Sequence, residues 1–178
     1  MTATPRRPIL SIALVTLITG CAAPYAAAPD VPLALKAPAN ESYLFTWHAV
    51  GSQIYECRAG EAGKLTWAFV APDADLFDDA REKVGTHGAG PHWAAPDGSK
   101  VTGTVKARAD AQRNGDVPWL LLAGTSAGGS GKLAAVTSVQ RIRTVGGAAP
   151  AQGCRAATDE GKRVKSPYTA DYVFFSAK

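Results

Sequence analysis

Apolar and polar residues alternate along short stretches of the chain. In the clearest stretch, 101–109, the even positions carry Thr, Lys or Arg, and the odd positions carry small or apolar residues (Val101, Gly103, Val105, Ala107 and Ala109). Successive side chains of a strand point to opposite faces. The segment therefore predicts a strand with one buried face and one wet face, which is typical of an antiparallel sheet.

Similar short runs rich in β-branched and aromatic residues recur through the chain. Pro96-Asp97-Gly98 predicts a hairpin turn before the 99–109 strand. The stretch 74–84 fits either a short helix capped by Asp73 or a turn at 78–81 that leads into a strand. The other predicted strands cover residues 43–47, 53–57, 65–70, 83–87, 92–95, 118–123, 134–145 and 171–175.

Length and composition agree with this pattern. The 178 residues are 46% apolar and 19% charged, enough for one domain with a core and unlike a disordered chain. The 18 glycines and 12 prolines interrupt the sequence too often for long helices. We expect an all-β fold, a single antiparallel β-sandwich or barrel of about nine strands with little helix, over residues 41–178.

The first residues have the pattern of an export signal. Arg6 and Arg7 precede an uncharged, mostly apolar run, 8–18, that is too short to span a bilayer. The run ends in Leu17-Ile18-Thr19-Gly20-Cys21, the lipobox pattern of bacterial lipoproteins. We expect a signal peptide over 1–20 and lipid attachment at Cys21. The alternative is an ordinary signal peptide cleaved near 26–28, although Pro29 follows that position directly.

Lipidation at Cys21 would determine where the protein resides. Ester- and amide-linked acyl chains such as palmitate would anchor it stably to a membrane, since a single chain binds only marginally. Ala22 at the next position favours sorting to the outer membrane, with the domain facing the periplasm. Residues 21–40, rich in Ala and Pro, predict an extended lipidated tether.

The remaining two cysteines, Cys57 and Cys154, form an even pair in an exported domain. Exported proteins fold in an oxidising compartment, which favours a Cys57–Cys154 disulfide. The alternative is a pair of free buried thiols.

The candidate chemistry centres on a glycine-rich segment, 85–93, that contains His87 and Trp93. Glycines permit backbone angles that other residues avoid, and a Trp near a His is common in small-ligand pockets. His87 and Trp93 are therefore candidate binding residues. The alternative is a structural corner between two strands with a buried Trp.

Other candidate sites are weaker. His87, His92 and Asp97 could hold a divalent metal if the chain turns between the histidines, but structural roles are more common and we expect no metal. Arg141 and Arg143 lie two apart on one predicted strand face and could bind an anion or simply be solvated.

The sequence argues against a nucleophile elbow, a phosphate-binding loop, a dinucleotide cofactor and nucleic-acid binding. The string 124–128 matches a nucleophile elbow, yet every histidine precedes it in the chain. The phosphate-loop pattern fails at Ser126 and Leu133. No dinucleotide fingerprint follows a strand, so we expect no cofactor. The net charge of +4 is small and does not indicate nucleic-acid binding.

Several short motifs, in order, resemble one family, the domain-of-unknown-function family 3455 of exported bacterial and secreted fungal proteins. The resemblance covers roughly residues 31–176. The family pattern usually has a bulky aromatic residue after the motif histidine, where this chain has Gly88. The motifs are Gln53–Cys57, Trp67–Pro72, Gly85–His87 with Gly90, Pro91 and Trp93, Asp97–Ser99, Pro118–Leu122, Val136–Thr137 with Gln140–Arg141, Gly146–Gly147, Gly153–Cys154 and Tyr168–Tyr172.

The family has no established activity, so function rests on the residues. We favour a lipid-anchored binding or structural domain of the cell envelope, with an envelope glycan or small molecule as the ligand. One alternative is a small hydrolase or lyase that uses His87. Another is a metal-binding envelope protein. The sequence does not determine the oligomeric state.

Overall fold

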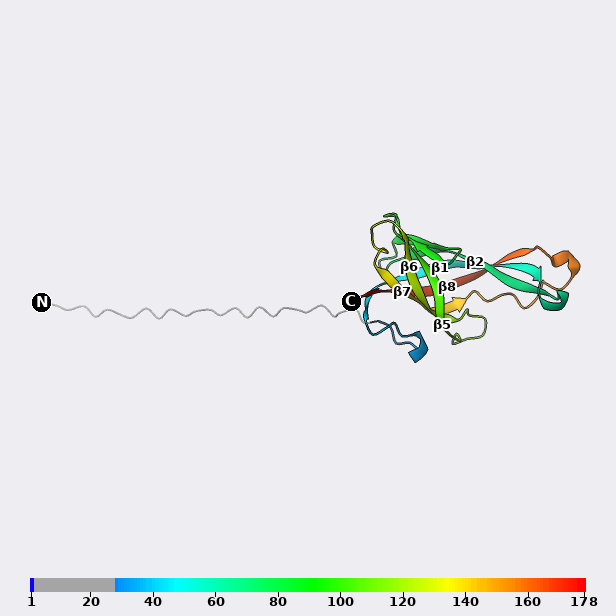
Figure 1. Ribbon diagram of the computed structural model, residues 1–178, viewed down its shortest axis with the longest axis horizontal. Helices are drawn as coiled ribbons and strands as arrows, with labels where there is room; N and C mark the ends of the chain where they lie inside the picture. The colour runs from blue at the N-terminus through cyan, green and yellow to red at the C-terminus, as the bar shows by residue number, and fades with distance from the viewer. Residues whose placement is uncertain (2–27) are drawn as a thin grey trace.

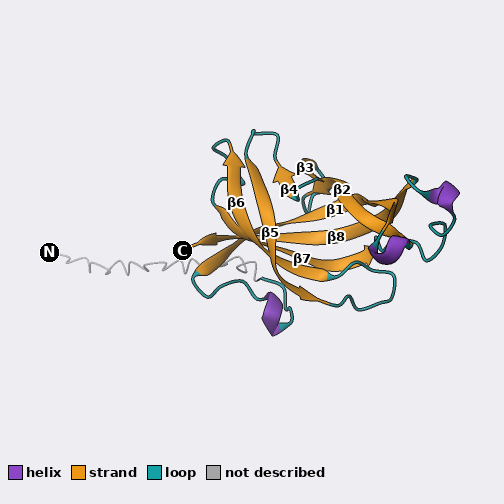
Figure 2. Ribbon diagram, turned by 45° about the vertical axis from the view of Figure 1, so that its right-hand side comes forward, coloured by secondary structure: helices purple, strands orange, loops and turns teal. Residues whose placement is uncertain are grey.

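A computed structural model describes Met1 and residues 28–178, so the predicted signal peptide and Cys21 lie outside the described residues. The eight strands form one closed barrel in which each strand is antiparallel to its neighbours and β8 pairs back with β1 (Figures 1 and 2). The expected all-β fold is confirmed, and of the two expected architectures the barrel is observed. The strands are β1 (Glu41–Ala59), β2 (Leu65–Phe77), β3 (Lys83–Gly88), β4 (His92–Ala94), β5 (Lys100–Ala109), β6 (Trp119–Gly128), β7 (Val136–Gly146) and β8 (Arg163–Ala177).

Helical structure in the described part of the chain is limited to three short 3-10 turns, η1 (Leu33–Leu35), η2 (Glu61–Gly63) and η3 (Ala157–Asp159). None of the helices within residues 28–178 is long and apolar enough to cross a membrane. The helix considered for 74–84 does not form. β2 continues to Phe77, and the Asp78 carboxylate accepts hydrogen bonds from the backbone N–H groups of Ala80 and Glu82 in the turn that follows.

One strand fewer than expected is present because 43–47 and 53–57 belong to the single strand β1. Gly51, which suggested a break between them, lies inside this strand. A Cβ at this position would collide with the backbone of Asp73 and Ala74 in β2. Glycine in a strand can mark the close approach of another backbone rather than a turn, and this is its role here.

Three strands extend beyond the barrel as an arm, visible at the right of Figure 1. β2 pairs with β1 down to Leu65 but with β3 only over Ala74–Phe77. The first residues of β8 pair with the same part of β1. The predicted disulfide is present: Cys57 in the arm is bonded to Cys154, with 5.5 Å between the Cα atoms. It fastens the loop before β8 to the arm.

The barrel interior is filled by large side chains at the end opposite the arm. Trp47, Trp93 and Phe174 are almost fully buried there, and both indole rings pack against the Phe174 ring. Leu133 closes this end, and its backbone N–H donates to the Ser99 hydroxyl. This end of the barrel is therefore filled and closed.

A second apolar cluster covers the outside of the barrel. Val31 and Leu35, from the N-terminal segment, pack with Trp119, Ile142, Val173 and Phe175. The Gln140 amide also donates to the Leu35 carbonyl oxygen at 2.6 Å. Residues that the sequence assigned to a tether over 21–40 thus contact the barrel from Val31 onward.

A β-bulge in β5 changes which of its residues face inward. A register shift between Val105 and Ala107 turns β5 by one residue, and such a slip reverses the faces beyond it. Ala107 and Ala109 consequently pack against the outer cluster. The prediction that residues 101–109 keep one apolar face throughout is wrong for this reason.

Candidate functional site

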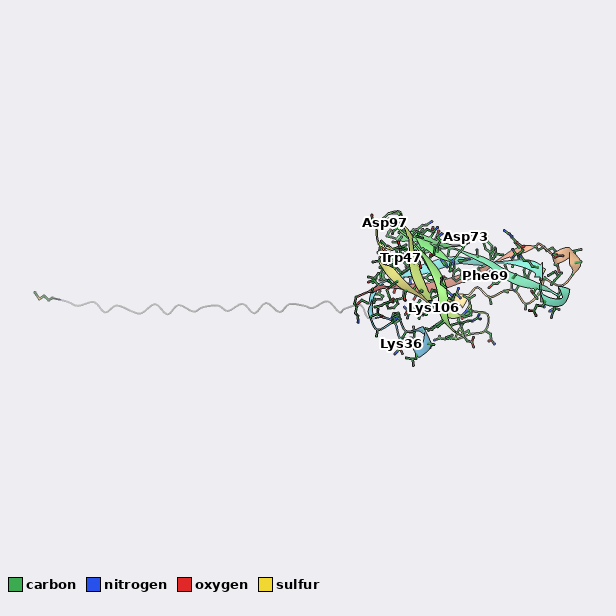
Figure 3. The ribbon with its side chains drawn as sticks, in the orientation of Figure 1. Lys36, Trp47, Phe69, Asp73, Asp97 and Lys106 are labelled. Carbon is green, nitrogen blue, oxygen red and sulfur yellow. A yellow bond between two sulfur atoms is a disulfide. The ribbon has the colours of Figure 1, made fainter. Side chains whose placement is uncertain are left out.

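A cavity of about 590 Å³ lies inside the barrel at the base of the arm. Tyr55 and Phe69 line it from the arm, and Leu120 and Leu122 line it from β6. Figure 3 labels Phe69 near this junction and Trp47 farther into the barrel. The cavity contains both binding residues that the sequence predicts, His87 and Trp93.

His87 and Trp93 meet because the chain turns sharply between β3 and β4. The two residues are directly paired across these strands, so both side chains point into the barrel. Their rings stack with 4.7 Å between centroids and 12° between planes. The imidazole is 4% exposed, and its Nδ1 lies 2.8 Å from the His92 carbonyl oxygen.

This hydrogen bond sets the tautomer of His87. A carbonyl oxygen only accepts hydrogen bonds, so Nδ1 carries the proton and Nε2 is left as an acceptor. Burial of the ring lowers the pKa of His87 to about 3. The imidazole is therefore neutral at physiological pH, and it combines a structural role at the strand corner with a place in the cavity wall.

The three residues considered for a metal site are not brought together. His92 pairs with Gly88 on the opposite face of the β3–β4 corner, and its Nδ1 donates to the Ala89 carbonyl oxygen. Asp97 accepts hydrogen bonds from Ser99 and from the backbone of Lys132 at the closed end. Within the described residues, no group of three or more His, Cys, Asp or Glu side chains could hold a metal ion.

Gly88, where the family pattern usually has an aromatic residue, also faces away from the cavity. A Cβ at this position would lie 2.8 Å from the His92 ring. The departure from the family pattern therefore alters the outer surface of the corner and leaves the cavity wall unchanged.

Arg141 also lines the cavity, a position that the sequence did not predict. It is paired with Tyr172 of β8 and faces inward, and its Nε and Nη2 donate to the Pro118 carbonyl oxygen at 3.1 and 2.8 Å. A register shift after Ile142 turns Arg143 outward, where it forms an ion pair with Asp171. The expectation that Arg141 and Arg143 share a face is wrong, because this bulge lies between them.

The bulge in β5 has a similar effect at the cavity mouth. It brings Arg108 to the mouth, together with Val105. The cavity lining thus includes two arginines and no Asp, Glu, Ser or Cys side chain. The cavity wall is therefore positively charged. Among the described residues that line it, no serine, cysteine or carboxylate is present that could work with His87 as a nucleophile or as a second acid or base.

Two buried hydrogen-bond donors in the cavity wall have no partner among the described residues. They are Gln53 Nε2, on a side chain that is 1% exposed, and Trp93 Nε1, on a side chain that is 0% exposed. A third, Trp47 Nε1, lies outside the cavity lining. Each unmet buried donor costs about 1–3 kcal/mol. Both nitrogens are closed off from the open space of the cavity, so a ligand would reach either of them only after a side chain moves.

The tyrosines of the cavity stay protonated. Burial raises the pKa of Tyr55 and Tyr172, which line the cavity, and the positive charge of Arg141 opposes this rise at both. The Tyr55 hydroxyl donates to the Gly147 carbonyl oxygen at 2.8 Å. These hydroxyls are neutral polar groups that can orient a ligand.

A second polar cluster lies on the outer surface, away from the cavity. His48 lies between two carboxylates, with Nε2 2.9 Å from Asp79 and Nδ1 2.7 Å from Asp171. The hydrogen bond with Asp79 is the main cause that raises the pKa of His48. This cluster could not be predicted from the sequence, because its members come from two separate strands and a turn.

Comparison with known proteins gives one match. Residues 38–176 match the model of the family described as Protein of unknown function (DUF3455), which agrees with the resemblance inferred from the motifs. No curated protein and no solved structure matches the chain. The match includes every residue of the cavity wall named above and all eight strands apart from the last residue of β8. On this basis the chain belongs to the DUF3455 family.

Proposed function

We propose that this protein is a lipid-anchored binding domain of the bacterial cell envelope and that its barrel cavity holds one small ligand. The observation that carries the proposal is the cavity of about 590 Å³, whose wall combines apolar side chains with a few convergent polar groups. Small-molecule sites have this size and composition, and eight-stranded barrels can enclose one small ligand.

A larger space, about 810 Å³, lies between the arm and the loop that the disulfide fastens. It is a weaker candidate because its wall contains neither His87 nor Trp93 and neither unpartnered donor. The cavity inside the barrel has a suitable volume and an apolar wall, and the two side chains with unpartnered donors, Gln53 and Trp93, belong to that wall.

The lipid anchor rests on the lipobox that ends at Cys21. The anchor would hold the barrel at the membrane through a short segment that reaches the outer cluster at Val31. Replacing the cysteine, Cys21→Ser, should move the protein from the membrane fraction to the soluble fraction or block its processing. Unchanged cleavage and membrane fractionation would contradict the anchor.

Cavity binding can be tested with N-phenyl-1-naphthylamine, a neutral apolar dye that fluoresces in apolar sites. We expect one dye per chain. Val105→Trp should abolish binding, because Val105 is 53% exposed at the cavity mouth and a larger side chain there would fill it.

Val145→Trp is the matched control, since Val145 is similarly exposed at 47% but does not line the cavity. This variant should bind the dye as the wild type does. Equal binding by both variants would place the dye elsewhere and would contradict the proposed function.

A further inference from the structure

We infer that the ligand of this cavity is an amphipathic carboxylate, with its carboxylate on Arg141 and its apolar body against the β6 leucines. This inference rests on the proposed function. It adds the chemical class of the ligand, and the observations below concern charge and hydrogen-bond donors, which the cavity volume alone does not define.

The first observation is the missing counter-charge. Arg141 has no ion-pair partner among the described carboxylates, although Arg143, two residues away, is paired with Asp171. Charged side chains that leave bulk water are normally paired. A guanidinium in a wall with no acidic residue is therefore a position for an anion supplied from outside the chain.

The second observation is the set of unpartnered donors in the same wall. Gln53 Nε2 and Trp93 Nε1 are both buried and have no acceptor within the part of the chain that the structure describes. A carboxylate has two oxygens with about four acceptor sites. It can therefore accept from Arg141 and, once the Gln53 side chain turns toward it, from that amide as well. Guanidinium groups also match the planar shape of a carboxylate.

The third observation concerns the rest of the wall. Leu120, Leu122, Phe69 and Val105 supply apolar surface. A small hydrophilic anion would leave this surface against water, whereas a ligand with an apolar body would bury it at about 25 cal/mol per Å². Charge at one position and apolar surface around it together indicate an amphipathic acid.

The test compares each acid with its neutral analogue. Decanoate and decanol represent an aliphatic body, and 2-naphthoate and 2-naphthalenemethanol represent an aromatic one. Dissociation constants are measured by isothermal titration calorimetry at pH 7.5. We expect at least one acid to bind wild type ten-fold or more tightly than its alcohol, and the pair that shows the preference identifies the kind of body.

Arg141→Met removes the charge and should weaken binding of that acid roughly 10- to 100-fold, as the loss of a charge-assisted hydrogen bond does, with little change for the alcohol. Arg143→Met is the matched control, because Arg143 points outward, and it should bind both probes as wild type does.

Arg141 also holds the Pro118 carbonyl oxygen, so a second variant guards against misfolding. Gln53→Glu keeps the shape of the side chain and places a negative charge beside the expected carboxylate. This variant should bind the acid much more weakly than wild type does and should bind the alcohol with an unchanged dissociation constant.

The outcomes separate the two proposals. Equal binding of acid and alcohol to wild type, or an acid preference that survives Arg141→Met and Gln53→Glu, would overturn the carboxylate inference. Failure of wild type to bind any of the four probes would overturn it as well. The neutral dye and Val105→Trp test the cavity itself, so the proposed function stands or falls on that separate result.

Discussion

Protonation of buried His87 should weaken the fold as the pH falls. The ring is 4% exposed, stacks on Trp93 and donates through Nδ1 to the His92 carbonyl oxygen. Burial lowers its pKa to about 3 from an ordinary value of 6.5. Between these two values the unfolded chain takes up a proton that the folded chain does not, so the free energy of unfolding decreases as the pH falls.

The size of the effect follows from the pKa difference. One group that is protonated only in the unfolded state lowers the free energy of unfolding by about 1.4 kcal/mol per pH unit. From pH 6 to pH 4.5, both inside the window, His87 should account for a loss of about 2 kcal/mol. Above pH 6.5 the ring is neutral in both states, and this contribution no longer changes.

The assay is urea unfolding of wild type and His87→Asn between pH 7.5 and pH 4.5, with the disulfide intact. Asn keeps an N–H donor near the position of Nδ1 and does not titrate. Groups that titrate in both proteins cancel in the difference between the two free energies. We expect that difference to change by about 2 kcal/mol between pH 6 and pH 4.5, to the disadvantage of wild type. Parallel pH profiles would refute the burial of a neutral ring.

Three further results are expected. Removal of the disulfide by Cys57→Ala with Cys154→Ala should lower the free energy of unfolding by about 4–5 kcal/mol, the loop-entropy value for a separation of 97 residues; a urea midpoint unchanged by reduction would contradict this. Leu35→Ala should cost about 2–5 kcal/mol in the same assay, because Leu35 is fully buried against the barrel, and a loss below 0.5 kcal/mol, about that of an ordinary surface change, would show that the N-terminal segment does not pack there. The pKa of His48 is raised in the folded protein, so its ion pairs stabilise the fold below pH 6.5 and this stabilisation is lost as the pH rises through the folded-state pKa. His48→Gln should therefore remove the part of the decrease in unfolding free energy above pH 6.5 that is due to this group. An unchanged pH dependence would exclude the ion pairs with Asp79 and Asp171.

The sequence was sufficient for the fold class, because a period of two and frequent glycines and prolines leave few alternatives to an antiparallel β structure. The pairing of Cys57 with Cys154 followed from having two cysteines left in a chain that the sequence predicts to be exported. Closure of the sheet was not predictable, since it depends on β8 pairing with β1 across nearly the whole domain. Gly51 misled the strand count because close backbone approach and turns both select glycine.

The candidate site was predicted in part, for a clear physical reason. His87 and Trp93 are close in sequence, and one turn suffices to pair them across two strands. Gln53 and Arg141 come from strands far apart in the chain, so only the closed barrel brings both into one wall. The bulge after Ile142 also separates Arg141 from Arg143, and alternation alone cannot place a bulge.

The central claim is that the barrel cavity holds a ligand, and a crystal structure of the mature protein purified from its host tests it most directly. We expect electron density that no protein atom or ordered water explains, lying between Leu122 and Arg141 with an acceptor atom within hydrogen-bond distance of the guanidinium. A cavity filled by rearranged side chains, or one that holds only water, would contradict the account.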